Sequence, residues 1–188
     1  MTLLALLRHA DTAWSEEGRI QGRSDVPLSE SGRARLRARA LPRDCRGMKV
    51  VTSPLARCVE TAALLGVPDA EREPRIAEMR WGAWEGRLLA ELRLELGEAM
   101  RQNEARGLDF RPEGGESPRE LLFRVSHWVS SLTESTMAIT HRGVIRVALA
   151  AATGWDMTGR PPVKLDWSAV HFFGIAGGRL TVDRLNVR

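Results

Sequence analysis

The stretch LLALLRHADT, residues 3–12, decides the fold of this chain. Its apolar run, Leu3–Leu7, has the continuous pattern of a strand that is buried on both faces of a sheet. Arg8 and His9 follow directly, at the point where this strand is expected to end. Ligands of open α/β sheets bind beyond the carboxyl ends of the strands. The stretch therefore predicts an α/β protein that carries reactive side chains at the end of its first strand.

Downstream of this strand, short apolar runs alternate with amphipathic segments, which is typical of a parallel sheet covered by helices. Strands are predicted at 48–52 and 137–140, and a closing hairpin pairs 170–175 with 180–185. Helices are predicted at 29–41, capped by Ser29 or Ser31, at 54–65, opened by Pro54, and at 119–132, capped by Ser117. Two further helices are predicted at 88–106 and 144–153, with loops at 14–27 and 107–118. This pattern predicts a single domain, residues 1–188, that folds as a three-layer α/β sandwich with a mostly parallel central sheet.

The composition narrows the functional classes. All but two of the 28 basic residues are arginine, against 24 acidic residues, and a hydrophobic content of 43% supports a packed core. Cys45 and Cys58 fit neither a disulfide framework nor a zinc-binding spacing. The apolar runs are too short for a signal peptide or a membrane span, so we expect a cytoplasmic protein without a membrane partner. The arginines of 33–39 spread around their helix, which favours a solvated surface over a nucleic-acid partner.

Three strand ends bring reactive side chains to one edge of the predicted sheet. Arg8 and His9 follow the first strand, Arg57 follows the second, and His141 follows the third, while Glu78 lies between the last two in sequence. Arginine forks match the oxygens of a phosphoryl group and stay charged at neutral pH. A histidine beside them favours its neutral, nucleophilic form, and a nearby carboxyl group can act as general acid. The set predicts phosphoryl transfer without a metal or another cofactor, because the cations themselves neutralise the phosphate.

A metal site is one alternative for the same residues. His9, His141 and Glu78 match a set of two histidines and one carboxylate. Fixed cations at Arg8 and Arg57 disfavour a bound divalent ion, because like charges repel each other. We therefore expect no metal.

Six motifs in the same order resemble the histidine phosphatase superfamily, which has the phosphoglycerate-mutase-like fold. They are Arg8-His9-Ala10-x-Thr12, Gln21-Gly22 with Asp25-x-Pro27-Leu28, Ser53-Pro54-Leu55-x-Arg57-x-x-x-Thr61, Glu78-x-x-x-Gly82-x-x-Glu85-Gly86, Gly114-Gly115-Glu116-Ser117 and His141-x-Gly143-Val144-Ile145-Arg146. The resemblance implies that His9 is the phosphorylated nucleophile and Glu78 the proton donor. It also implies that Arg8, Arg57 and His141 complete the phosphate pocket.

The resemblance further implies a set of residues that border the phosphate or the substrate, namely Thr12, Ser15, Gln21, Gly22 and Gly143. Ser15 stands where the family often has asparagine, so one amide donor is lost. Arg142 follows the second histidine, where glycine is frequent. This arginine either adds a third cation near the mouth of the site or points to solvent.

The function that the resemblance implies is a phosphomonoester hydrolase that acts on a small phosphorylated metabolite through a phosphohistidine. The alternative is transfer of the cofactor-dependent phosphoglycerate mutase type, which passes through the same intermediate. Mutases of that type carry a longer insertion than the segment between Gly82 and Gly114, which favours the hydrolase. Four arginines of the segment 87–115 either bind a second anionic group of the substrate or lie on the surface. They are Arg93, Arg101, Arg106 and Arg111. A homodimer is compatible with the sequence. The sequence does not identify the physiological substrate.

Overall fold

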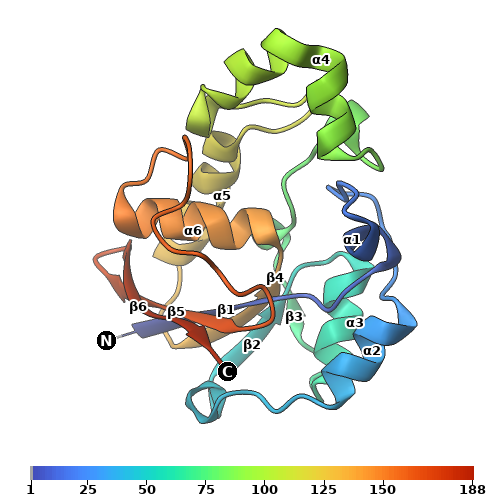
Figure 1. Cartoon of the computed structure of the whole chain (residues 1–188). Coiled ribbons are helices and arrows are strands. Elements are labelled where there is room, and N and C mark those ends of the chain that lie inside the picture. Colours follow the sequence, from blue (N-terminus) through green and yellow to red (C-terminus); the bar gives the residue numbers. More distant parts are fainter. Residues whose placement is uncertain (1) are drawn as a thin grey trace.

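The computed structural model describes residues 2–188, and the strands of this part of the chain form one sheet in the order β3-β2-β4-β1-β5-β6. The strands are β1 (Thr2–Arg8), β2 (Lys49–Thr52), β3 (Glu71–Arg72), β4 (Thr136–Thr140), β5 (Val170–Ala176) and β6 (Arg179–Val187). The helices are α1 (Ala13–Glu17), α2 (Glu30–Arg37), α3 (Ala56–Leu64), α4 (Leu89–Glu104), α5 (Pro118–Ser130) and α6 (Arg142–Thr153), with short 3-10 helices at Arg43–Cys45, Pro74–Ile76, Gly82–Trp84 and Gly107–Asp109. The first four strands pair in parallel, and β5 runs antiparallel to β1 and β6. The sheet is thus mostly parallel, as predicted, with an antiparallel hairpin at one edge (Figure 1).

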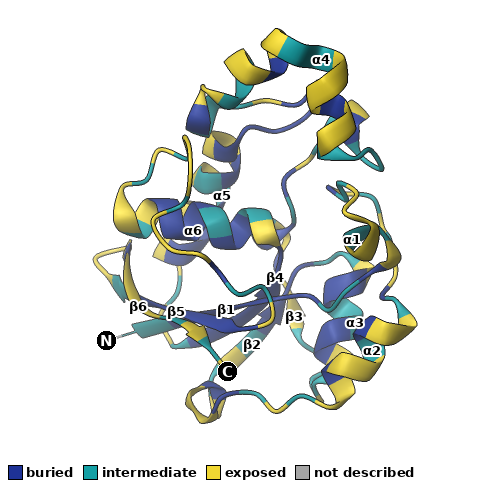
Figure 2. Cartoon of the chain, in the orientation of Figure 1, coloured by how far each residue is buried: buried dark blue, intermediate teal, exposed yellow. Residues whose placement is uncertain are grey.

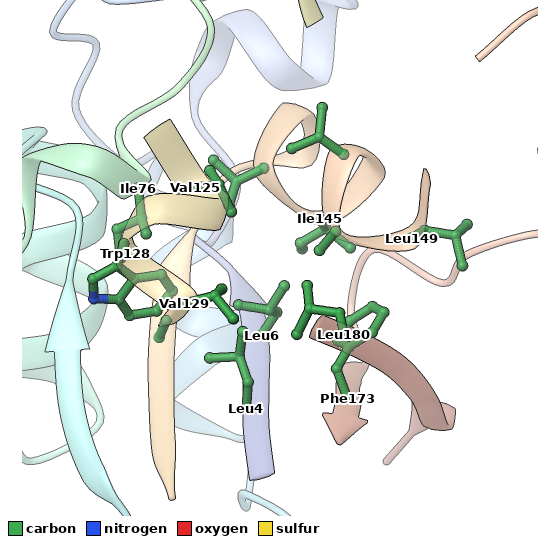
Figure 3. Close-up of a cluster of buried hydrophobic side chains, with 14 of the residues drawn as sticks. Leu4, Leu6, Ile76, Val125, Trp128, Val129, Ile145, Leu149, Phe173 and Leu180 are labelled. Atoms are coloured by element: carbon green, nitrogen blue, oxygen red, sulfur yellow. The ribbon is translucent and has the colours of Figure 1, made fainter. Parts of the chain in front are cut away.

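Helices cover both faces of this sheet and complete the three layers. On one face, Leu4 and Leu6 of β1 pack against α5 and α6 (Figure 3). On the other face, Ala5 and Leu7 pack against α3. All four side chains are fully buried, and β1 lies in the dark blue interior of Figure 2. Because both faces are covered, β1 shows no alternation of polar and apolar residues.

The order of the strands places three carboxyl ends next to one another. β4 lies between β2 and β1 and is parallel to both. Arg8, the last residue of β1, pairs with Thr140, the last residue of β4. The residues that follow, His9 and His141, therefore emerge side by side, with ring centroids 5.2 Å apart.

Helix α4 lies apart from the sheet, beyond α6 in Figure 1. Its apolar residues Leu92 and Met100 are buried against Trp84 in a small separate core. Gly97 interrupts the helical backbone with a φ of 51° and a ψ of −118°, a conformation that favours glycine. The helix predicted at 88–106 is present, but it is kinked at this glycine.

Three local predictions differ from the structure. Residues 14–27, predicted as a loop, contain most of α1, a helix of five residues that is too short to show a periodic pattern. The helix capped by Ser29 ends at Arg37 rather than Leu41, and the amide of Arg39 turns back to Leu36. The loop predicted at 107–118 contains the 3-10 helix Gly107–Asp109. Each difference concerns a short helix or a helix end. The hydrogen bonds of a single turn determine such features.

Among the helices of residues 2–188, none has the length and the apolar character needed to cross a membrane.

Candidate active site

His9 is oriented by the backbone around it. Its amide donates to the carbonyl of Thr140 at 2.9 Å, and its ring Nδ1 lies 2.7 Å from the carbonyl oxygen of Ala10. Because a carbonyl oxygen only accepts, Nδ1 carries the proton and Nε2 keeps its lone pair. The hydroxyl of Thr61 accepts from the amide of Ala10 at 3.1 Å and holds this turn in place. The ring therefore presents an unprotonated Nε2, the form that a nucleophile needs.

Arg57, in the first turn of α3, is fully buried although it is charged. Its Nη1 and Nη2 donate to the carbonyls of Ser24 and Gly22 at 2.8 and 2.7 Å. Its Nε lies 3.3 Å from His9 Nε2, and Nη2 lies 3.3 Å from His141 Nδ1. Burial lowers the pKa of Arg57, but a guanidinium remains charged at any working pH. The guanidinium of Arg57 thus contacts one ring nitrogen of each histidine.

Arg8 supplies a second cation beside His9. Its side chain is buried, and its Nη1 donates to Asp11 Oδ1 at 3.0 Å. Arg35 of α2 holds the other oxygen of Asp11 at 2.8 Å. Asp11 therefore holds the Arg8 guanidinium through an ion pair, and Arg35 holds Asp11 in turn.

His141 is the single residue between β4 and α6, and it is fully buried. Its Nε2 lies 2.7 Å from the Oγ of Ser53 and 3.4 Å from the sulfur of Cys58. Burial raises the pKa of Cys58 to about 12, so this neighbour is an uncharged thiol. The ring is held by neutral partners on one side and by Arg57 on the other.

The pKa values of His9 and His141 are both lowered. Burial, Arg8 and Arg57 hold the pKa of His9 well below its usual value of 6.5. Burial and Arg57 do the same for the pKa of His141. A low pKa keeps the proton off the ring, because the charged form loses hydration and meets like charges. Both histidines are therefore neutral at pH 7.

Glu78 brings the carboxyl group to the site from the segment before the 3-10 helix Gly82–Trp84. Its Oε1 accepts from the amide of Met79 at 2.8 Å, and Oε2 accepts from the amide of Gly143 at 3.2 Å. Burial raises the pKa of Glu78 above its usual value of 4.5, and this effect exceeds the opposing effect of the two amides. A carboxyl group with a raised pKa holds its proton nearer to neutral pH, as a general acid must.

The approach of Glu78 to α6 requires glycine at position 143. A methyl group added at Gly143 would overlap the carboxylate of Glu78, which is the flexible end of a side chain. We expect Gly143→Ala to fold normally, to displace this carboxylate and to lower kcat for alkyl phosphates by about 10–100-fold. Steady-state kinetics and thermal melting check this expectation.

Two comparisons isolate the cause of that effect. Ala151→Ser adds one atom to the exposed side of α6 and serves as the matched control. In the Glu78→Gln background, Gly143→Ala should add little further loss, because both changes act on the same group. If Gly143→Ala lowered kcat equally in the wild type and in Glu78→Gln, its effect would not act through Glu78.

These side chains line a cavity of about 590 Å³. Its inner end holds the predicted residues Arg8, His9, Arg57 and Glu78 together with Gly143. The rest of the lining combines apolar and charged side chains. The apolar ones include Ile20, Met79, Trp81, Leu89, Phe110 and Met157, and the charged ones are Arg19, Arg93, Glu104, Arg142 and Arg146. The cavity therefore has a cationic end beside His9, and its remaining walls can make both apolar and ionic contacts.

The remaining predicted residues fall into two groups. Ser15, Gln21 and Gly22 line the cavity, whereas Thr12 and His141 lie fully buried behind its wall. The Thr12 hydroxyl donates to Gln21 Oε1 at 2.9 Å, and it also caps α1. The Ser15 hydroxyl bonds to Thr12 and Asp11 within this cap, so it forms part of the local turn. Thr12 thus positions Gln21 and does not itself border the cavity.

The second carboxylate of the acid motif, Glu85, has a structural task. Its Oε1 accepts from the amides of Arg23 and Trp81, and its Oε2 accepts from the amide and the hydroxyl of Ser24. The distances lie between 2.6 and 3.1 Å. These bonds hold the loop whose carbonyls bind Arg57, so Glu85 supports the pocket from outside.

Sequence patterns did not reveal the support of Glu78. Arg124 of α5 donates to both oxygens of Glu116 at 2.7 and 3.0 Å, and its Nη2 donates to the carbonyl of Glu78 at 3.1 Å. The Nε of Arg23 donates to the same carbonyl at 2.6 Å. Nothing in the spacing of these residues along the chain indicates that they meet, because the contacts join distant segments.

Comparisons with known proteins agree with this geometry. Residues 4–188 match the family model of the histidine phosphatase superfamily (branch 1). The chain is 31% identical to phosphoserine phosphatase 1 of Hydrogenobacter thermophilus over 172 residues, which cover 84% of this chain and 79% of that protein. It is 35% identical to 2,3-bisphosphoglycerate-dependent phosphoglycerate mutase 2 of Gloeobacter violaceus over 132 residues, which cover 66% of this chain and 60% of the mutase.

Solved structures of the same fold include TTHB049 of Thermus thermophilus, with a TM-score of 0.75 and 30% identity over 99% of this chain and 100% of that chain. A mycobacterial glucosyl-3-phosphoglycerate phosphatase has the same fold, with a TM-score of 0.83 at 22% identity, and both chains are covered fully. A family match over nearly the whole chain shows that this protein belongs to branch 1 of the histidine phosphatase superfamily.

Proposed function

We propose that this protein hydrolyses a small phosphomonoester through a phosphohistidine at His9. In the first half of the reaction, His9 Nε2 attacks phosphorus and the bond from phosphorus to the ester oxygen breaks. Glu78 gives its proton to the leaving oxygen, and the alcohol departs. Arg8 and Arg57 stabilise the charge that is spread over the oxygens of the transferring phosphoryl group.

In the second half, a water molecule attacks the phosphorus of phospho-His9. Glu78, now a carboxylate, takes a proton from this water while the bond from phosphorus to nitrogen breaks. Inorganic phosphate leaves, and the protonated Glu78 and the neutral His9 are restored. The carboxyl group thus acts first as acid and then as base, and the cycle is balanced.

The observation that carries this proposal is the geometry around His9 and Glu78. An unprotonated His9 Nε2 faces the buried Arg57, and Glu78, in the same cavity, has a raised pKa. Hydrolysis is favoured over the mutase reaction because the relative named as a phosphatase matches 84% of this chain, against 66% for the mutase. Metal independence is supported by Arg57, whose guanidinium stands between the two histidines.

Phosphate release from 3-phosphoglycerate and from 4-nitrophenyl phosphate, with and without EDTA, tests the proposal. We expect inorganic phosphate and the free alcohol in equal amounts, at the same rate in EDTA. The formation of 2-phosphoglycerate without free phosphate would identify a mutase instead. Loss of activity in EDTA that a divalent metal restores would contradict the metal-independent mechanism.

A further inference from the structure

Four arginines line the cavity outside its phosphate pocket, and they differ in their partners. Arg19 donates to Glu17 and to a backbone carbonyl, and Arg93 donates to Glu104 at 2.8 Å. Arg142 and Arg146 also line the cavity. Within residues 2–188, neither of these two guanidinium groups has a hydrogen-bonded or ion-paired carboxylate. Their charges are therefore available to a ligand.

Both guanidinium groups lie over indole rings. The Cζ of Arg142 lies 5.1 Å from the ring centroid of Trp167, and that of Arg146 lies 5.2 Å from the ring centroid of Trp155. The indole N–H of Trp155 donates to a backbone carbonyl at 2.9 Å, so this ring is itself held in place. A ring face attracts a cation without accepting a conventional hydrogen bond, and within residues 2–188 no hydrogen bond engages either guanidinium group. The two side chains are thus held in position with free donors.

Their positions on α6 place these donors beside the reacting groups. Arg142 directly follows His141, and Arg146 lies one turn further along the same face, with about 6 Å between their Cβ atoms. Burial lowers the pKa of Arg146, but the group stays charged. The charge of Glu78 raises the pKa of both guanidinium groups, and Asp11 also raises that of Arg142. Glu78 must be protonated before it can act as an acid. In that reactive form, no nearby negative charge compensates Arg146.

We propose that Arg142 and Arg146 form a second anion-binding subsite, which selects phosphomonoesters whose alcohol part carries a carboxylate or a second phosphate. This inference rests on the phosphatase function proposed above. The subsite lies along one turn of α6 from the phosphate pocket, so the two anionic groups of the substrate are separated by a short chain. Trp81, Phe110 and Met157 also line this cavity and offer apolar contacts to such a chain.

Matched substrates and an uncharged variant test the subsite. Each pair differs only in its second anion: 3-phosphoglycerate against glycerol 3-phosphate for the carboxylate, and propanediol bisphosphate against 3-hydroxypropyl phosphate for the phosphate. We expect the wild type to prefer the doubly anionic member of at least one pair by about tenfold or more in kcat/KM, since hydrogen bonds to charged groups are the strong ones. Arg146→Met should reduce this preference about tenfold, mainly through KM, and Arg146→Lys should restore part of it.

Arg106→Met is the matched control, because it removes an exposed arginine that does not line the cavity. A preference for doubly anionic substrates that survives in Arg146→Met would overturn the subsite. So would a wild type that hydrolyses both members of each pair equally. Failure of the wild type to release phosphate from any of the four substrates, or from 4-nitrophenyl phosphate, would instead overturn the proposed function.

Discussion

His9→Ala should reduce phosphomonoester turnover by about 10⁴-fold or more, because the variant lacks the nitrogen that attacks phosphorus. The neighbouring rings cannot replace it. His141 is fully buried behind the cavity wall, and its Nε2 already faces Ser53. Incubation with a ³²P-labelled substrate, followed by a denaturing quench, should leave an acid-labile label on the wild type and none on the variant.

His127→Ala is the control for His9→Ala, since His127 is an exposed histidine on α5 outside the cavity. It should keep wild-type turnover and wild-type labelling. Circular dichroism at increasing temperature confirms that His9→Ala is folded. A folded His9→Ala that retained its phosphate label would move the nucleophile to another residue, and normal turnover in this variant would contradict the mechanism.

Glu78→Gln should slow alkyl phosphates by about 10²–10³-fold, because an alkoxide leaves poorly without a proton. Glutamine keeps the shape of glutamate, and its one amide oxygen can accept from the backbone amide of Met79 or from that of Gly143, which bond to different oxygens of Glu78. Cleavage of 4-nitrophenyl phosphate should suffer less, since nitrophenolate is a good leaving group. Water attack then limits turnover, and rapid mixing should show a burst of nitrophenolate close to one per active site.

The pH dependence of the same variant gives a second test. The raised pKa of Glu78 means that kcat/KM for alkyl phosphates falls as pH rises above that pKa, because the acid has lost its proton. The lowered pKa of His9 places the opposite limb below pH 6.5, where the ring becomes protonated and loses its nucleophilic lone pair. Glu78→Gln should remove the alkaline limb and keep the acidic one.

Glu71→Gln, on the short strand β3, is the control for Glu78→Gln and should leave the rates and the pH profile unchanged. Equal slowing of alkyl and aryl phosphates by Glu78→Gln would contradict the role of Glu78 as general acid. Glu85 would be the next carboxylate to consider, although four hydrogen bonds from Arg23, Ser24 and Trp81 occupy its oxygens.

The sequence predicted the parts of this molecule that local patterns control. Leu3–Leu7 reads as a strand buried on both faces because its residues are apolar without interruption, and β1 has that environment. The serine before α2 caps the helix as its position indicates. The short helix α1 escaped prediction because a capping box of Thr12 and Ser15, rather than a periodic pattern, specifies it. The support of Glu78 by Arg124 escaped prediction because it depends on packing between distant segments.

The sequence by itself identified the family, because the motifs around Arg8, His9 and His141 adjoin strand ends that local hydrophobicity reveals. The tertiary structure determined which arginines line the cavity without a carboxylate partner and can therefore bind a substrate. Arg93 appeared in the sequence as a candidate for a second anion, but Glu104 on the same kinked helix neutralises it. Arg146 is left without a carboxylate because α6 faces the cavity and Trp155 covers the guanidinium. Ion pairing depends on which residues the fold brings within reach, and composition carries no such information.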